Sequence, residues 1–171
     1  MLFVGIDPGL TGAIGAVDVG GMYVKVQDTP SMLRLRDEGA GEPVQVRLPD
    51  CVGMSFLILR LMEEAGGATE LRVTIEEQWA RPRQSAQSTF ITGGGFWAWL
   101  GVLAACGVAV MEVSPQAWKR EYGLLGKGKE GSRGRASAYF PAAPLSLKKH
   151  HNRADALLLA HYGWQTWGWG T

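Results

Sequence analysis

The chain has 171 residues, of which 46% are hydrophobic and 19% are charged. This length and composition fit one soluble globular domain, and they exclude a disordered chain and an enzyme built from two lobes. The net charge of +1 hides an asymmetry, because residues 1–115 hold 8 Lys or Arg against 13 Asp or Glu, whereas residues 116–153 hold 9 against 2. Such a basic segment favours contact with nucleic acid.

Cysteine usage and the apolar runs favour a cytoplasmic protein. Cys51 and Cys106 form no CxxC or Cys/His pattern, so neither a disulfide framework nor a structural zinc site is expected. The longest apolar run, residues 96–111, contains two glycines and is shorter than the roughly 18–20 residues that a bilayer span needs. No signal peptide is expected, because Asp7 interrupts the first apolar run.

The first half of the chain predicts a three-strand meander, a helix and a fourth strand. Short apolar runs between Gly and Pro turns predict the strands, and apolar positions at helical spacing predict the helix. The expected elements are strands at residues 1–6, 13–19 and 22–27, a helix at 50–65 and a strand at 71–75. Residues 30–49 mix charges with Gly and Pro and are expected to form a loop.

The second half predicts a core helix, a buried strand and two further helices. Three glycines at residues 93–95 are interpreted as a flexible break that follows a polar segment. The expected elements are helices at residues 96–106, 115–122 and 151–167 and a strand at 108–113, and residues 123–135 are Gly/Lys/Arg-rich with no element assigned. This order predicts an α/β domain at residues 1–163, with a mixed five-stranded sheet flanked by helices, and a C-terminal tail at 164–171.

Three acidic residues stand at the ends of predicted elements. Asp7 ends the first strand, Glu76 ends the fourth strand, and Asp155 lies one turn into the last helix. If the first and fourth strands are neighbours, Asp7 and Glu76 meet at one edge of the sheet, and the start of the last helix can bring Asp155 to them. Converging carboxylates repel one another unless a cation neutralises them, so the cluster implies Mg²⁺ or Mn²⁺.

Each acid taken alone has an ordinary explanation. An Asp before Pro-Gly is commonly a turn residue, Glu-Glu after a strand is commonly solvated, and a His-His-Asn-Arg helix start commonly caps the helix. Three segments in this order are harder to explain in that way: residues 5–12 (GIDPGLTG), 74–77 (TIEE) and 151–160 (HNRADALLLA). Together they resemble the RuvC family of Holliday-junction resolvases, more closely its phage-type members, over residues 3–163.

The resemblance implies an RNase H-like fold and a crossover junction endodeoxyribonuclease that acts as a homodimer in a bacterial cell or a phage-infected host. Such an enzyme cuts two opposed strands of a four-way DNA junction with divalent metal, and it needs no nucleotide cofactor and no membrane. The catalytic and metal-binding residues carried over are Asp7, Glu76, His151 and Asp155. Family members often have Asp three or four residues before the last acid. These positions hold Asn152 and His151, so Asn152 is kept as the alternative ligand.

The implied chemistry is two-metal hydrolysis of a phosphodiester. Two ions, roughly 3.5–4 Å apart, activate a water and stabilise the leaving 3′ oxygen, which leaves 5′-phosphate and 3′-hydroxyl ends. In this interpretation Asp7 bridges both ions, Glu76 holds one, and His151 with Asp155 holds the other. Glu77 is a less favoured candidate than Glu76 for the second metal ligand, because alternation along the strand points only one of the two side chains toward the site.

DNA contacts are expected from the basic segment and from the segment after the second acid. Next to a metal site that needs a polyanionic substrate, phosphate binding is favoured over an ordinary solvated basic face. The candidates are Arg81, Arg83, Gln84, Gln87, Lys119, Lys127, Lys129, Arg133, Lys148, Lys149 and Arg153.

Two symmetric cuts require two active sites, which a homodimer supplies through one self-complementary surface. Interfaces favour tryptophan, and the chain has seven. The candidates for this interface are Phe96, Trp97, Trp99 and Leu100.

Two other functions stay open. An actin-like or sugar-kinase-type ATPase also fits the hairpin at residues 5–12, although such enzymes need two lobes and a second Gly-rich nucleotide segment. A junction-binding protein without catalysis fits the presence of His151 and Asn152 where an acid is common.

Overall fold

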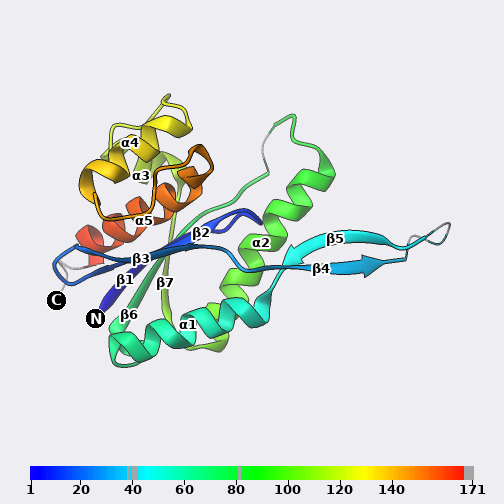
Figure 1. The fold of residues 1–171 in the computed structure, drawn as a ribbon, viewed down its shortest axis with the longest axis horizontal. Helices are drawn as coiled ribbons and strands as arrows, with labels where there is room; N and C mark the ends of the chain where they lie inside the picture. The colour runs from blue at the N-terminus through cyan, green and yellow to red at the C-terminus, as the bar shows by residue number, and fades with distance from the viewer. Residues whose placement is uncertain (38, 40–41, 81, 168–171) are drawn as a thin grey trace.

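The computed structural model describes residues 1–37, 39, 42–80 and 82–167. A five-stranded sheet carries helices on both faces, and a separate two-stranded sheet projects from it (Figure 1). The strands are β1 (Leu2–Asp7), β2 (Ala13–Asp18), β3 (Tyr23–Asp28), β4 (Ser31–Arg36), β5 (Val44–Pro49), β6 (Leu71–Glu76) and β7 (Ala109–Val113). The helices are α1 (Cys51–Ala65), α2 (Ala86–Ala105), α3 (Pro115–Glu121), α4 (Lys129–Tyr139) and α5 (His151–Trp167), with the short 3-10 helices η1 (Ala68–Glu70) and η2 (Lys148–His150).

The large sheet has the strand order β3-β2-β1-β6-β7. β1 pairs antiparallel with β2 and parallel with β6, and β6 pairs parallel with β7. The mixed five-stranded sheet and the expected pairing of the strands that end in Asp7 and Glu76 are both confirmed. Since β1 and β6 run parallel, their carboxyl ends lie at the same edge, and Ile6 pairs with Ile75 one residue before each acid.

Alternation along the central strands divides the core into two layers. On β1, Val4 and Ile6 pack with α1 and α2, whereas Phe3 packs with α3, α4 and α5 on the opposite face. On β6, Val73 and Ile75 also face α1 and α2. By this period of two, the acids at the ends of both strands lie on the face that α5 covers.

Residues 30–49 form a β-hairpin, and the expectation of a loop was wrong. β4 and β5 pair antiparallel in continuous register, from Ser31 opposite Pro49 to Arg36 opposite Val44. Both faces of this two-stranded ribbon lie largely in solvent. Residues 33–36 and 44–48 do alternate apolar and polar side chains, but the prediction gave more weight to the charges, Gly and Pro around them.

α2 begins at Ala86 and runs through the glycines at residues 93–95, where a flexible break was expected. Ser85 caps the helix, because its Oγ accepts a hydrogen bond from the backbone N of Ser88 at 3.1 Å. Gly95 faces the turn after β1, where an added Cβ would lie 2.5 Å from the carbonyl oxygen of Pro8. The glycine thus permits a close approach of the helix to this turn and does not interrupt the helix.

Within the described residues, α2 has the length and composition of a membrane span. One side of its C-terminal half is buried, with Trp99 and Leu103 fully enclosed by α1 and the sheet. Packing of this kind is typical of the core helix of a globular domain.

α4 begins in the Gly/Lys/Arg-rich segment, residues 123–135, to which no element was assigned from the sequence. Its Ser132 and Ala136 are buried, and the helix packs against α5, because small side chains allow the two helices to approach. The sequence interpretation missed it because glycines interrupt its apolar pattern.

α5 has the bounds expected from the sequence. Trp164, which was assigned to a tail, belongs to this helix, and its Nε1 donates to the carbonyl oxygen of Val19 at 2.9 Å. The helical part of the domain therefore extends to Trp167. The rest of the expected tail, residues 168–171, lies outside the described residues.

Candidate active site

Direct packing of α5 on β1 brings Asp155 to Asp7. An added Cβ at Gly5 would lie 2.1 Å from the carbonyl oxygen of Ala156, so the helix can approach this closely only at a glycine. Gly5 precedes Asp7 by two residues, and Ala156 follows Asp155. The same contact therefore places both carboxyl groups at the carboxyl edge of the sheet.

A polar cavity of about 370 Å³ opens at this edge. Its lining residues are Asp7, Glu76, Gln78, Trp79, Gln84, Thr92, Lys129 and Asn152. β1 and β6 supply the two acids, α2 supplies Thr92, and the first turn of α5 supplies Asn152. The structure thus brings together chemical groups that lie up to 145 residues apart in the chain.

Burial and mutual repulsion raise the pKa values of two carboxyl groups at this site. Burial raises the pKa of Asp7 from 3.8 to about 7, and the charges of Asp155 and Glu76 add to the effect. Burial also raises the pKa of Asp155 from 3.8 to about 6, although a hydrogen bond with Ser132 opposes the rise. Both shifts favour a site that would bind a cation when its carboxyl groups ionise.

Neighbouring side chains hold the carboxylate of Glu76 in place. Trp118 Nε1 donates to Oε2 at 2.7 Å, and Gln78 Nε2 donates to Oε1 at 3.1 Å. Lys119 Nζ lies 4.0 Å from Oε2 in an ion pair, and its charge lowers the pKa of Asp7. Lys119, which was expected to contact DNA, therefore belongs to the acidic centre itself.

The donors at this site fit a divalent metal ion. Asp155 Oδ1 is buried without a hydrogen-bond partner, and Asp7 and Glu76 supply two further carboxylates. Carboxylate and amide oxygens are the ligands that Mg²⁺ and Mn²⁺ prefer. In the described part of the chain, no three His, Cys, Asp or Glu side chains lie close enough together to hold a metal ion as they stand.

Of the two candidate ligands in the first turn of α5, Asn152 lines two neighbouring cavities and His151 lines only one of them. Asn152 lines the cavity that contains Asp7 and Glu76, and its Nδ2 donates to the carbonyl oxygen of Thr11. His151 lines a neighbouring cavity, and its Nδ1 lies 3.2 Å from the carbonyl oxygen of Lys148. The geometry therefore favours the alternative ligand, Asn152. Helical spacing could not decide this, because positions three and four residues before Asp155 both share its face.

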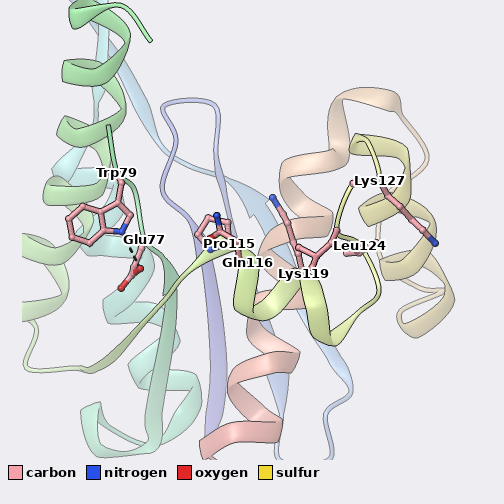
Figure 2. Close-up of a pocket in the computed structure, with 9 residues that line it drawn as sticks. Glu77, Trp79, Pro115, Gln116, Lys119, Leu124 and Lys127 are labelled. Carbon is pink, nitrogen blue, oxygen red and sulfur yellow. Dashed lines mark hydrogen bonds between the residues drawn. The ribbon is translucent and has the colours of Figure 1, made fainter. Parts of the chain in front are cut away.

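Glu77 lies on a second cavity, of about 500 Å³, beside the first. Figure 2 shows Glu77 and Trp79 on one wall of this cavity and Lys119 and Lys127 on the other. Glu77 Oε2 accepts a hydrogen bond from Trp79 Nε1 at 3.2 Å. Alternation along β6 thus separates Glu76 from Glu77 as the sequence predicted.

Comparisons with known proteins point to one fold. No protein family model matches the chain. The chloroplastic Holliday junction resolvase MOC1 of Chlamydomonas reinhardtii is 46% identical over 66 residues, which are 37% of this chain and 8% of that protein. Two solved structures of Thermus thermophilus RuvC match 94% and 95% of this chain and 91% and 95% of their own, with TM-scores of 0.57 and 0.52 and identities of 21% and 20%. One of these structures is a complex with a Holliday junction substrate.

The chain has a RuvC-like fold. The RNase H-like architecture expected from the sequence is thereby confirmed. The chain spans only a small part of the length of MOC1.

Ion pairs within the RuvC-like fold occupy two of the candidates for DNA contacts. Arg153 donates to both carboxylate oxygens of Asp28, at 2.6 and 2.9 Å. Arg133 pairs with Glu130 and donates to the carbonyl oxygen of Ser146 at 3.0 Å. Both arginines thus make contacts within the fold, and their binding to DNA stays a prediction.

The other candidates differ in their distance from the acidic cavity. Gln84 and Lys129 line it. Those on the exposed surface are Arg83, Gln87, Lys127, Lys148 and Lys149. Arg81 lies outside the described residues.

The candidates for a dimer interface differ in how far they are exposed. Phe96 and Trp99 are buried in the core of the RuvC-like domain, so the expectation was wrong for these two. Trp97 is 69% exposed, and Phe90, 79% exposed, lies seven residues earlier on the same face of α2. Leu100 is half-buried.

The raised pKa of Asp7 predicts that the metal-free RuvC-like domain loses stability as pH rises toward 8. In the unfolded chain Asp7 titrates near 3.8, whereas in the folded chain it holds its proton up to about pH 7. Its stabilising contribution is therefore complete below pH 3.8 and is lost as pH rises through about 7. Asp7→Asn, which cannot ionise, is expected to unfold roughly 5–10 °C above wild type at pH 8.

Thermal unfolding in EDTA at pH 5, 6.5 and 8 measures this difference. The advantage of the Asn variant is expected to shrink toward pH 5, where Asp7 of the wild type is also neutral. Glu63→Gln, on the exposed surface of α1, is the control for removal of one carboxylate. An advantage that stays the same at all three pH values contradicts the buried, ionisable Asp7.

Proposed function

We propose that this chain is a metal-dependent, structure-specific DNA endonuclease that resolves four-way junctions by paired symmetric nicks. The observation that carries the proposal is the convergence of Asp7, Glu76 and Asp155, from three distant segments, at one edge of a RuvC-like sheet. The 46% identity to a Holliday junction resolvase over 66 residues supports the substrate.

The oxygen donors of Asp7, Glu76, Asp155 and Asn152 would hold two Mg²⁺ or Mn²⁺ ions. When bound, the ions supply activation of the attacking water and stabilisation of the leaving 3′ oxygen. Trp118 and Gln78 fix the carboxylate of Glu76 before any ion binds, so little side-chain entropy is lost when it does.

Two lysines at the site suit the scissile phosphate. Lys129 lines the acidic cavity, and Lys119 lies at the boundary between this cavity and the one that holds Glu77. An ammonium group at these positions would bind the phosphate oxygens and offset the negative charge of the acids, which otherwise repel DNA. The products would carry 5′-phosphate and 3′-hydroxyl ends.

Two symmetric nicks need two active sites, and we assign these to a homodimer. Trp97 and Phe90 form an exposed aromatic pair on α2 that suits a self-complementary contact. The same helix approaches the turn that follows Asp7. A two-fold contact through α2 would therefore lie close to both catalytic sites.

A labelled synthetic four-way junction, incubated with the protein and Mg²⁺ or Mn²⁺, tests the proposal. We expect paired nicks at symmetric positions in opposed strands, with no cutting of a matched linear duplex and none in EDTA. Sedimentation velocity in the same buffer is expected to give twice the monomer mass of 18.5 kDa. A gel shift without nicks contradicts the nuclease and favours a junction-binding protein, and ATP turnover without nicks favours an ATPase.

A further inference from the structure

The β4–β5 ribbon projects away from the rest of the domain (Figure 1). Its root is closed by a hydrogen bond from the backbone N of Asp50 to the carbonyl oxygen of Pro30, at 3.1 Å. Beyond the root, Leu33 and Leu35 are 57% and 71% exposed. A two-stranded ribbon of this kind has no core of its own and is marginally stable in water. It therefore adds little to the stability of the domain, which suggests a role in binding.

The strands of the ribbon carry positive charge. Arg34 and Arg36 lie on β4, and Arg47 lies on β5, where its Nη1 donates to Ser31 Oγ at 2.8 Å. Neither strand contains an acid, and the acids of this segment stand between the strands in the sequence, at positions 37, 38 and 42. Arg34 and Arg36 are two residues apart and therefore share one face. Within the described residues, both are exposed and neither forms a hydrogen bond or an ion pair.

A second basic feature lies at the root of the ribbon. A cavity of about 430 Å³ joins Arg47 to Lys149 and to His151 at the start of α5. Asp28 also lines this cavity, but Arg153 neutralises it through two hydrogen bonds. The cations Arg47 and Lys149 therefore dominate the charge of the cavity.

This basic cavity adjoins the acidic one. Asn152 and its neighbour Thr11, joined by a hydrogen bond, form the boundary, and Asn152 lines both cavities. A DNA strand with one phosphate at the acids would therefore reach Arg47 and Lys149 next and then the exposed strands of the ribbon.

We infer that the β4–β5 ribbon and the cavity at its root bind the sugar-phosphate backbone of the junction arm next to the cut. Arg47 and Lys149 take the phosphate nearest the acids, and Arg34 and Arg36 take phosphates farther along the arm. Six residues of strand span about 20 Å, which matches about six base pairs. The inference rests on the proposed nuclease function.

Charge favours DNA over a second copy of this chain as the partner of the ribbon. Arg34 and Arg36 have no partner among the described residues, and their guanidinium groups suit phosphate in geometry and charge. A second copy would instead use Leu33 and Leu35, which lie with Arg47 on the opposite face from Arg34 and Arg36. Substitution of Arg34 and Arg36 therefore tests DNA binding without changing the leucine face.

The test compares wild type with Arg34→Ala/Arg36→Ala and with Arg47→Ala. The control is Arg60→Ala on α1, which removes an exposed arginine far from the ribbon. Far-UV circular dichroism and thermal unfolding verify that each variant folds. Junction affinity is measured in EDTA across a range of salt concentrations, and hydroxyl-radical footprinting maps the protected arm.

The double variant is expected to bind the junction about 10-fold more weakly at 0.1 M salt, with the slope of log K against log salt smaller by about 2. Its footprint is expected to shorten by up to about six base pairs on the arm beside the cut. Arg47→Ala is expected to lose protection next to the cut, and Arg60→Ala to match wild type. Cleavage of saturated junction by the double variant should stay within about 3-fold of wild type, because no ribbon arginine lines the acidic cavity.

Unchanged slopes and footprints in a wild type that cuts junctions overturn the ribbon inference and leave the nuclease intact. A wild type that binds junctions without cutting, and whose ribbon variants bind weakly, overturns the nuclease and supports the ribbon. A protein that binds no DNA overturns both. If Leu33→Ser/Leu35→Ser halves the sedimenting mass while the arginine variants bind normally, the ribbon is a dimer contact and the inference is wrong.

Discussion

Asp7→Asn is expected to lower the rate of junction cleavage in Mg²⁺ by roughly 10³-fold or more, while junction affinity stays within about 3-fold of wild type. The substitution keeps the shape of the side chain and removes the charge that would hold both ions. DNA binding depends on cations that lie elsewhere, among them Lys129 at the cavity wall. Single-turnover cleavage and a binding assay in Ca²⁺ measure the two effects separately.

The neighbouring glutamates provide a matched pair of controls. Glu76→Gln is expected to lose cleavage in the same way as Asp7→Asn, because its carboxylate lines the same cavity. Glu77→Gln is expected to retain it, because its carboxylate faces the second cavity. Full activity of Asp7→Asn, or equal losses in both glutamine variants, contradicts the assignment of the acidic centre.

Gly5→Ala is expected to destabilise the domain by roughly 3 kcal/mol or more and to lower its melting temperature by roughly 6–12 °C. The added Cβ would lie 2.1 Å from the carbonyl oxygen of Ala156 and 2.2 Å from the backbone N of Ala160. Both contacts are with backbone, so relief requires α5 to move away from β1. Since Asp155 lies on that helix, cleavage by the folded fraction should also fall.

Gly101→Ala is the control for this substitution. Gly101 lies on an exposed part of α2, and an added Cβ meets nothing within 4 Å. Alanine favours a helix over glycine by about 1 kcal/mol, so this variant is expected to be as stable as wild type or more stable. Thermal unfolding of both variants makes the comparison. A Gly5→Ala protein as stable as Gly101→Ala contradicts the direct packing of α5 on β1.

Much of the secondary structure could be predicted from the sequence, because most elements bury apolar residues. β1, β2 and β6 are buried on both faces and form short apolar runs, and α1 has apolar residues at helical spacing. The strands of the β4–β5 ribbon alternate, but apolar residues of one strand lie opposite polar residues of the other, so neither face is apolar throughout. The start of α2 was missed because its glycines resemble a break, whereas Gly95 is required by the nearby Pro8 carbonyl.

The candidate site shows the same division. Asp7 and Glu76 could be placed together from the sequence, because parallel strands bring their carboxyl ends to one edge and alternation selects Glu76 over Glu77. The choice between His151 and Asn152 could not be made, since both share a helix face with Asp155. The rotation of α5 on the sheet decides it, and contacts across the whole domain set that rotation.

The sequence by itself determined the α/β sheet, the three acids and the basic character of residues 116–153, since each follows from residue types and local spacing. Only the tertiary structure decided that Arg133 and Arg153 are held in ion pairs, that Asn152 lines the acidic cavity, and that a ribbon with exposed Arg34 and Arg36 begins beside it. The physical reason is the distance along the chain over which each kind of interaction acts. Backbone periodicity reports which face of an element is buried, whereas ion pairs and shared cavities depend on how segments more than 100 residues apart pack together.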